Sequence, residues 1–181
     1  MGSDMHSQQI SDISRPVDDA HLQVEQVVAG LREADRSLAC AESLTGGRLA
    51  STVVDVPGSS AVFRGGAVTY ATETKATVLG VPAGLLTDRG PVDPEVAMAM
   101  ASGAASLFGA DLGVATTGVA GPDQQDGVAV GTVFTAVVDT VSGVSIVRGE
   151  SLTGDRASIR QQSVELALAM ILEALAEPQP A

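Results

Sequence analysis

Residues 37–54 read SLACAESLTGGRLASTVV, and this stretch contains both kinds of element on which the predicted fold depends. The run 37–41 is short, apolar and flanked by charged residues, which is typical of a buried β-strand. After a turn with two adjacent glycines, the sequence to about Val54 has a helical pattern, and Pro57 ends it. A strand that leads directly into a helix is the unit from which α/β folds are built.

The neighbouring segments extend this alternation of helices and strands in both directions. Val24, Val28 and Leu31 fall on one helical face before the quoted stretch. After it, Asp93 followed by Pro94 is a strong signal for the start of a helix. In chain order we predict a helix around 24–31, a strand over 63–70, a helix through Lys75 that ends at Gly80, a helix from 93 to about 109, and a strand over 111–117.

The C-terminal part of the sequence completes the fold prediction. Two β-rich runs, 128–139 and 143–150, predict an antiparallel hairpin, and a final helix begins near Asp155. The whole pattern predicts an α/β protein with three layers, in which helices cover both faces of a mixed, mostly parallel sheet. We expect one domain over 17–176, a disordered lead-in over 1–16 and a frayed tail over 177–181.

The composition excludes several classes of protein. A formal net charge of −12 leaves no basic patch for nucleic acid, and no segment is long and apolar enough to span a membrane. With no signal peptide and Cys40 as the only cysteine, we predict a cytoplasmic protein without disulfides. Both histidines, His6 and His21, fall in or near the lead-in, which excludes Ser-His-Asp triads and histidine-rich zinc sites. We expect no metal and no cofactor. Short alanine-rich helices with few aromatic anchors favour a homo-oligomer.

Two residue types that occur once in the chain lie five positions apart, at Tyr70 and Lys75. The nine other basic residues are all arginines, so lysine is not needed for surface charge. A desolvated lysine can lose its proton and act as a base, which requires its pKa to fall by roughly 3, equivalent to about 4 kcal/mol. The alternative is that Lys75 is a solvated cation on a helix and Tyr70 an ordinary aromatic at a strand end.

Ser43 lies at the junction between the predicted strand and the helix that follows. It can simply be the N-cap of that helix. In the functional interpretation, the free N–H groups of the helix N-terminus stabilise an oxyanion or a phosphate, and Gly46 and Gly47 let a ligand approach the backbone. The sequence leaves both interpretations open.

Two further segments are candidates for ligand contacts. The loop 116–123, TTGVAGPD, follows a predicted strand, and turn formation by its glycines and Pro122-Asp123 is its simplest explanation. Arg156 and Arg160 lie four residues apart at a helix start and so share a face. They either bind a phosphate or pair with carboxylates of this acidic surface, and pairing is the preferred interpretation.

The predicted topology brings these candidates together. In open α/β sheets, ligands bind beside the carboxyl ends of the strands. The Ser43 turn, the segment 70–75 and the loop 116–123 all follow predicted strands. We therefore predict that they form a single site.

Taken together, these motifs resemble those of the CinA C-terminal family. Characterised members are nicotinamide-nucleotide amidases, which hydrolyse nicotinamide mononucleotide to nicotinate mononucleotide and ammonia. The resemblance covers about residues 20–175. Its motifs are AESLTGG at 41–47, GSS at 58–60, GAVTY at 66–70, Lys75, TGVAGPD at 117–123, VGTV at 130–133 and GDR at 154–156.

The resemblance implies a three-layer α/β/α fold and a metal-free serine amidase whose partner is a small nucleotide. Ser43 would be the nucleophile, Lys75 its base and Tyr70 a proton relay or positioning group. Two alternatives stay open: a nucleotide-binding module without turnover, and an amidase that acts on a related metabolite. The implied substrate-binding residues are Glu42, Thr45, Gly46, Gly47, Thr117, Gly118, Gly121 and Arg156.

Overall fold

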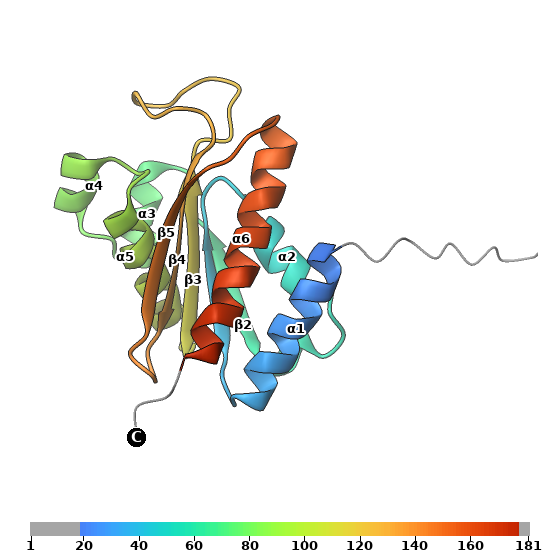
Figure 1. Cartoon of the computed structure of the whole chain (residues 1–181). Coiled ribbons are helices and arrows are strands. Elements are labelled where there is room, and N and C mark those ends of the chain that lie inside the picture. Colours follow the sequence, from blue (N-terminus) through green and yellow to red (C-terminus); the bar gives the residue numbers. More distant parts are fainter. Residues whose placement is uncertain (1–18, 178–181) are drawn as a thin grey trace, which may run out of the picture.

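The computed structural model describes residues 19–177 of the 181-residue chain. The predicted lead-in, 1–16, and all but the first residue of the predicted tail, 177–181, lie outside the described residues. In the described part, one sheet lies between two layers of helices (Figure 1). This arrangement confirms the α/β fold class that the sequence predicts.

The central sheet consists of β1 (Leu38–Glu42), β2 (Phe63–Val68), β3 (Leu112–Gly118), β4 (Thr132–Asp139) and β5 (Ser145–Ser151). The spatial order is β2-β1-β3-β4-β5. β1 pairs in parallel with β2 and β3, whereas β4 is antiparallel to both β3 and β5. Four strands therefore run in one direction and β4 alone runs in the other, so the sheet is mixed, as predicted.

The described α-helices are α1 (Asp19–Glu33), α2 (Arg48–Val54), α3 (Thr72–Leu79), α4 (Ala83–Arg89), α5 (Pro94–Phe108) and α6 (Arg156–Ala176), and a 3₁₀ helix, η1 (Ser59–Ala61), lies between α2 and β2. α1, α2 and α6 cover one face of the sheet, and α3, α4 and α5 lie on the other (Figure 1). None of these helices combines the length and hydrophobicity that a membrane-spanning helix requires.

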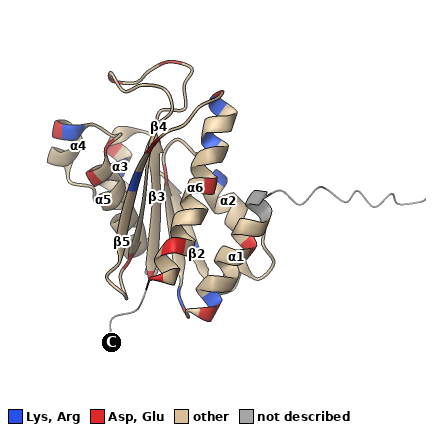
Figure 2. Cartoon of the chain, in the orientation of Figure 1, with Lys and Arg blue, Asp and Glu red and all other residues tan. Residues whose placement is uncertain are grey.

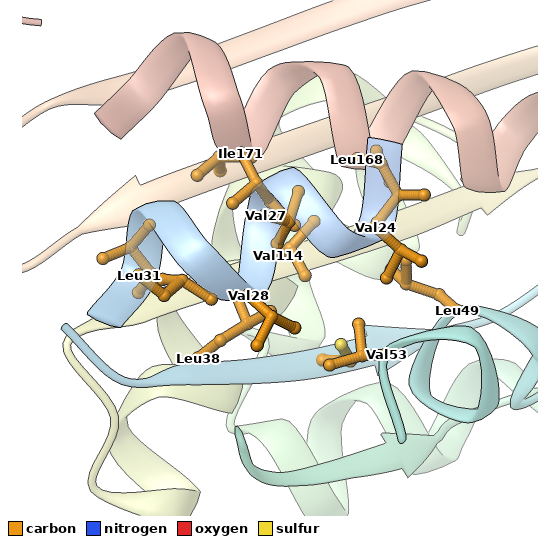
Figure 3. Packing of buried hydrophobic residues seen from close by; sticks show 14 of the residues in the cluster. Val24, Val27, Val28, Leu31, Leu38, Leu49, Val53, Val114, Leu168 and Ile171 are labelled. Atoms are coloured by element: carbon orange, nitrogen blue, oxygen red, sulfur yellow. The ribbon is translucent and has the colours of Figure 1, made fainter. Parts of the chain in front are cut away.

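The face covered by α1 and α6 carries the larger apolar side chains. Val27 and Leu31 of α1 and Ile171 of α6 are fully buried and converge over Leu38 of β1 and Val114 of β3 (Figure 3). Burial of each large aliphatic side chain contributes about 1.5–3 kcal/mol. This cluster fixes β1 and β3 side by side, and the candidate site lies at the ends of these two strands.

The opposite face is packed with small residues, which bring its helices close to the sheet. Ala97, Ala101 and Ala104 of α5 are fully buried. At Gly103 an added Cβ would collide with the backbone carbonyl of Leu79 at the end of α3. The small residues therefore let α3 lie directly against α5.

Two elements differ from the sequence prediction. The short helix α4 was not predicted, because its seven residues follow Pro82 and carry little apolar periodicity. The run 128–131, predicted as the start of a strand, is not part of β4: Val128 forms an isolated antiparallel bridge with Gln125, a turn follows, and β4 begins at Thr132. The amide of Gly131 donates to the carbonyl of Val119 at 2.8 Å, so this turn is tied to the loop that follows β3.

Candidate active site

Ser43 is held in a tight turn directly after β1. Its amide donates to the carbonyl of Thr116 at 2.9 Å, which extends the pairing of β1 with β3. The amide of Gly46 donates back to the carbonyl of Ser43 at 3.1 Å and closes the turn. Gly46 and Gly47 have φ of 62° and 90°, which side-chain-bearing residues rarely adopt. The two glycines are thus required by the backbone of the turn.

Glu42 occupies the N-terminus of α2. Its side chain is 1% exposed and accepts hydrogen bonds from the amides of Gly47, Leu49 and Ala50 at 2.9, 3.1 and 2.8 Å. α2 begins only at Arg48. Two interpretations of the sequence are therefore wrong: Ser43 is not the N-cap of this helix, and the first amides of the helix are not free to hold an oxyanion.

Lys75 points from α3 into the protein and reaches Ser43. Its Nζ lies 3.1 Å from Ser43 Oγ and 2.7 Å from the carbonyl oxygen of Thr69, and the residue is 1% exposed. Burial lowers the pKa of Lys75 from 10.5 to about 8, and the negative charge of Glu73 opposes this only in part. Lys75 is therefore not a solvated surface cation.

Tyr70 lies at the rim and not beside Lys75. It is 59% exposed, and its hydroxyl accepts a hydrogen bond from Nη2 of Arg156 at 2.8 Å. Nη1 of the same arginine donates to the carbonyl of Gly121 at 2.6 Å. Among the described residues, no hydrogen bond joins Tyr70 to Lys75 or Ser43. Arg156 thus connects the Tyr70 side of the site to the loop after β3.

Threonines from two strand ends make internal hydrogen bonds around the site. The hydroxyls of Thr45 and Thr116 lie 2.7 Å apart, and both residues are fully buried. Thr117 donates its hydroxyl hydrogen to the carbonyl of Pro91 at 2.6 Å. This last bond ties the segment before α5 to the end of β3 and so closes one side of the site.

A cavity of about 110 Å³ lies at this end of the sheet. Seven residues predicted for the site line it: Ser43, Tyr70, Lys75, Thr117, Gly118, Gly121 and Arg156. Four other predicted residues are not among its lining residues, and their contact with substrate stays a prediction: Glu42, Thr45, Gly46 and Gly47.

The cavity also has walls that the sequence interpretation missed. Pro91 and Val92 come from the segment before α5, and Gln125 comes from the loop after β3, just beyond the candidate segment 116–123, which supplies Asp123. That loop extends beyond the end of the sheet at which α6 begins (Figure 1). The only sequence signal for Pro91 and Val92 was their position directly before the predicted helix start at Asp93.

Arg160 contacts the Ser43 turn from α6. Its Nε donates to the carbonyl of Leu44 at 2.9 Å, and its Nη2 donates to the carbonyl of Thr45 at 2.6 Å. Basic residues occupy the first turns of α6 (Figure 2). The preferred interpretation, pairing of Arg156 and Arg160 with carboxylates, is wrong for the described residues, because both guanidiniums donate to uncharged oxygens.

The sequence profile of the CinA C-terminal domain matches residues 21–175. The chain belongs to this family. A CinA-like protein from Frankia casuarinae is 48% identical over 154 residues, which cover 84% of this chain and 35% of the relative. A CinA-like protein from Mycobacterium marinum is 44% identical over 159 residues, 86% of this chain and 36% of the relative. The chain therefore spans about a third of the length of these curated relatives.

Solved structures of CinA family proteins have the same fold. The competence damage-inducible protein A (ComA) from Klebsiella pneumoniae is 32% identical, with a TM-score of 0.85 over 90% of this chain and 100% of that chain. The competence/damage inducible protein CihA from Agrobacterium tumefaciens is 33% identical, with a TM-score of 0.83 over 88% of this chain and 97% of that chain. The fold and family expected from the sequence motifs are thus confirmed.

Proposed function

We propose that this CinA-family protein is a cytoplasmic amidohydrolase that converts nicotinamide mononucleotide to nicotinate mononucleotide and ammonia. The observation that carries the proposal is the distance of 3.1 Å between Lys75 Nζ and Ser43 Oγ. Nucleophile and base within hydrogen-bond reach are the signature of covalent catalysis by a serine. The choice of substrate rests on the family resemblance of the motifs.

In the proposed reaction, Lys75 in its neutral form accepts the proton of Ser43 Oγ while that oxygen attacks the carboxamide carbon. The resulting ammonium then gives the proton to the leaving nitrogen, and ammonia departs. Lys75, neutral again, takes a proton from water, which attacks the acyl-serine ester. Collapse of this second intermediate releases the carboxylic acid and returns the proton to Ser43 Oγ.

The oxyanion would be bound by amides of the Ser43 turn. The N–H groups of Leu44 and Thr45 make no hydrogen bond to other described residues. Leu44 lines the cavity, and the amide that follows a nucleophile commonly donates to the oxyanion. We therefore assign this role to the turn and not to the N-terminus of α2, which Glu42 already caps.

Tyr70 and Arg156 would position the substrate at the rim. The cavity of about 110 Å³ is smaller than the roughly 300 Å³ at which small-molecule pockets usually begin, so only part of a nucleotide would enter it. The carboxamide-bearing ring would lie at Ser43, and the phosphate would lie outside, toward Arg156. Of the two roles implied for Tyr70, positioning fits its hydrogen bond with Arg156 better than proton relay.

The test is release of ammonia from nicotinamide mononucleotide by the purified protein, with nicotinamide riboside as a control for phosphate recognition. Ser43→Ala and Lys75→Ala should each abolish ammonia release. Lys75→Arg should not restore it, because a guanidinium cannot give up its proton. Full activity of Lys75→Arg would show that the residue acts only as a charge. Tight binding of nicotinamide mononucleotide without ammonia release would instead favour a binding module.

A further inference from the structure

Arg160 is the one described side chain that donates hydrogen bonds to two successive carbonyls of the Ser43 turn. It comes from the second turn of α6, next to Ile159, which is buried and anchors the helix. The start of α6 is capped by Asp155, whose carboxylate accepts from the amide of Ser158 at 2.8 Å. The guanidinium is therefore presented to the turn by a well-anchored helix end.

The turn is shaped to accept this guanidinium. A Cβ placed on Gly46 would lie 3.2 Å from Nη2 of Arg160, which is tighter than most real contacts of a Cβ atom. Both hydrogen bonds involve a charged donor, and such bonds are about twice as strong as neutral ones. Arg160 also lies outside the set of cavity-lining residues, whereas Arg156 lies within it. Direct contact with substrate is thus a role for Arg156 and not for Arg160.

Peptide geometry links these carbonyls to the amides on the other side of the chain. In a planar trans peptide the N–H points opposite to the C=O, so fixing one fixes the other. Arg160 holds the carbonyl of Leu44 and thereby sets the direction of the Thr45 N–H. It also holds the carbonyl of Thr45 and so orients the Gly46 N–H, which closes the turn onto the carbonyl of Ser43. That last bond orients the Leu44 N–H in the same way.

We propose that Arg160 is a positioning residue for the hydrolysis: by clamping the carbonyls of Leu44 and Thr45, it holds Ser43 Oγ and the Leu44 amide in their reactive places. This inference rests on the proposed function, because it concerns the geometry of the same nucleophile. It adds a residue that reaches the chemistry only through the backbone of the turn. A displacement of about 1 Å in such a group can lower the rate on the order of 100-fold.

The experiment measures the rate at which a fluorophosphonate probe labels Ser43, followed by mass spectrometry, together with kcat and KM for nicotinamide mononucleotide. Arg160→Met keeps an unbranched side chain about as long as the aliphatic part of arginine but removes every donor. Arg160→Lys keeps the charge but has no fork for two carbonyls. Arg148→Gln is the matched control, because Arg148 pairs with Glu173 of α6 on the surface, away from the cavity. Ser43→Ala controls for the site of labelling, and thermal unfolding checks each fold.

We expect Arg160→Met to lower both the labelling rate and kcat on the order of 100-fold. The labelling rate and kcat of Arg160→Lys should lie between those of this variant and the wild type. If Arg160→Met does not fold, Arg160→Lys therefore tests the proposal. KM and the midpoint of the pH–rate profile should change little, and Arg148→Gln should behave as wild type. Wild-type labelling by folded Arg160→Met or Arg160→Lys would overturn the proposal. A rise in KM alone, with normal labelling, would overturn it as well and would make Arg160 a substrate-binding residue.

The probe separates this inference from the choice of substrate, because it needs no nucleotide. If the wild type is labelled at Ser43 but releases no ammonia from nicotinamide mononucleotide, the proposed substrate is wrong. The labelling rates of the variants then still decide the role of Arg160. If the wild type is not labelled at all, Ser43 is not a reactive nucleophile, and the role of Arg160 falls with it.

Discussion

At the scale of single residues, the surroundings of Lys75 explain how an amine can lose its charge in a protein with a net charge of −12. Removal from water disfavours the ammonium form and outweighs the attraction of Glu73. The two oxygens within reach of Nζ, Ser43 Oγ and the Thr69 carbonyl, are both uncharged. Among residues 19–177, the amine thus has no carboxylate as a hydrogen-bond partner that would keep it protonated.

The first prediction concerns the pH dependence of the reaction. Ammonia release should rise with pH and level off above a midpoint near 8, because only the neutral form of Lys75, whose pKa is about 8, can accept the serine proton. The measurement is kcat as a function of pH at saturating substrate. A profile that stays flat through about pH 8 would contradict the assignment of Lys75 as the base.

A second prediction separates the two possible roles of Tyr70. Its hydroxyl contacts Arg156 and not Lys75, so Tyr70→Phe should raise KM by roughly fivefold, the value of about one hydrogen bond, and leave kcat nearly unchanged. Steady-state kinetics measure both constants. Arg156→Lys serves as the comparison, because it should raise KM in the same direction. A large fall in kcat for Tyr70→Phe would support the proton relay instead.

At the scale of elements, two adjacent residues at the junction of β1 and α2 have separate roles. Glu42 faces inward and satisfies the amides that begin the helix, while Ser43 is free of that task and faces the cavity. A carboxylate is also well placed there because the N-terminus of a helix carries partial positive charge. The Ser43 turn therefore depends on the buried carboxylate of Glu42, which takes no part in the proposed chemistry.

This division predicts that Glu42→Ala destabilises the protein. Three amides lose a charged acceptor in a buried place, so the free energy of unfolding should fall by about 2–4 kcal/mol. Urea denaturation measures this loss. Glu173→Ala, which breaks an exposed ion pair with Arg148, should change stability by less than about 1 kcal/mol and is the control. Equal stabilities of the two variants would mean that the cap is unimportant.

At the scale of the whole molecule, the two helical layers are built differently, and this difference positions the site. Large aliphatic residues hold α1 and α6 on one face, whereas alanines and glycines hold α5 close on the other. α6 brings Arg160 to the Ser43 turn, and α3, packed on α5, brings Lys75 to the same point. The site therefore depends on the packing of both layers.

Gly103 tests the close packing of α3 on α5, because here a change from glycine to alanine should destabilise the protein. Glycine-to-alanine changes inside helices normally stabilise by about 1 kcal/mol, but here the new Cβ would collide with the backbone carbonyl of Leu79. Gly103→Ala should therefore lower the melting temperature and, by displacing α3, also reduce ammonia release. Gly84→Ala in α4 is the matched control, because the Cβ would meet open space there and should stabilise. Stabilisation by Gly103→Ala would refute this account of the packing.

The sequence predicted the fold class and brought Ser43 and Lys75 to one site, because both follow parallel strands whose carboxyl ends meet at one edge. The sequence did not predict contacts that depend on the direction of the backbone in a turn or on segments far apart in the chain. The capping of α2 by Glu42 depends on a turn in which Gly46 and Gly47 have positive φ, and a pattern of residues does not specify these backbone angles. Arg160 contacts a carbonyl 116 residues away, which local periodicity could not reveal. The predicted homo-oligomer stays a prediction.

The most direct test of the central claim is to titrate Lys75 itself. Because it is the only lysine in the chain, protein labelled with isotope-enriched lysine gives a single side-chain signal by NMR, with no assignment problem. We predict that this signal titrates with a pKa near 8, so that a substantial share of the amine is neutral at that pH. A titration at the ordinary value of 10.5 would show a charged, solvated lysine and would contradict the proposed Ser43–Lys75 chemistry.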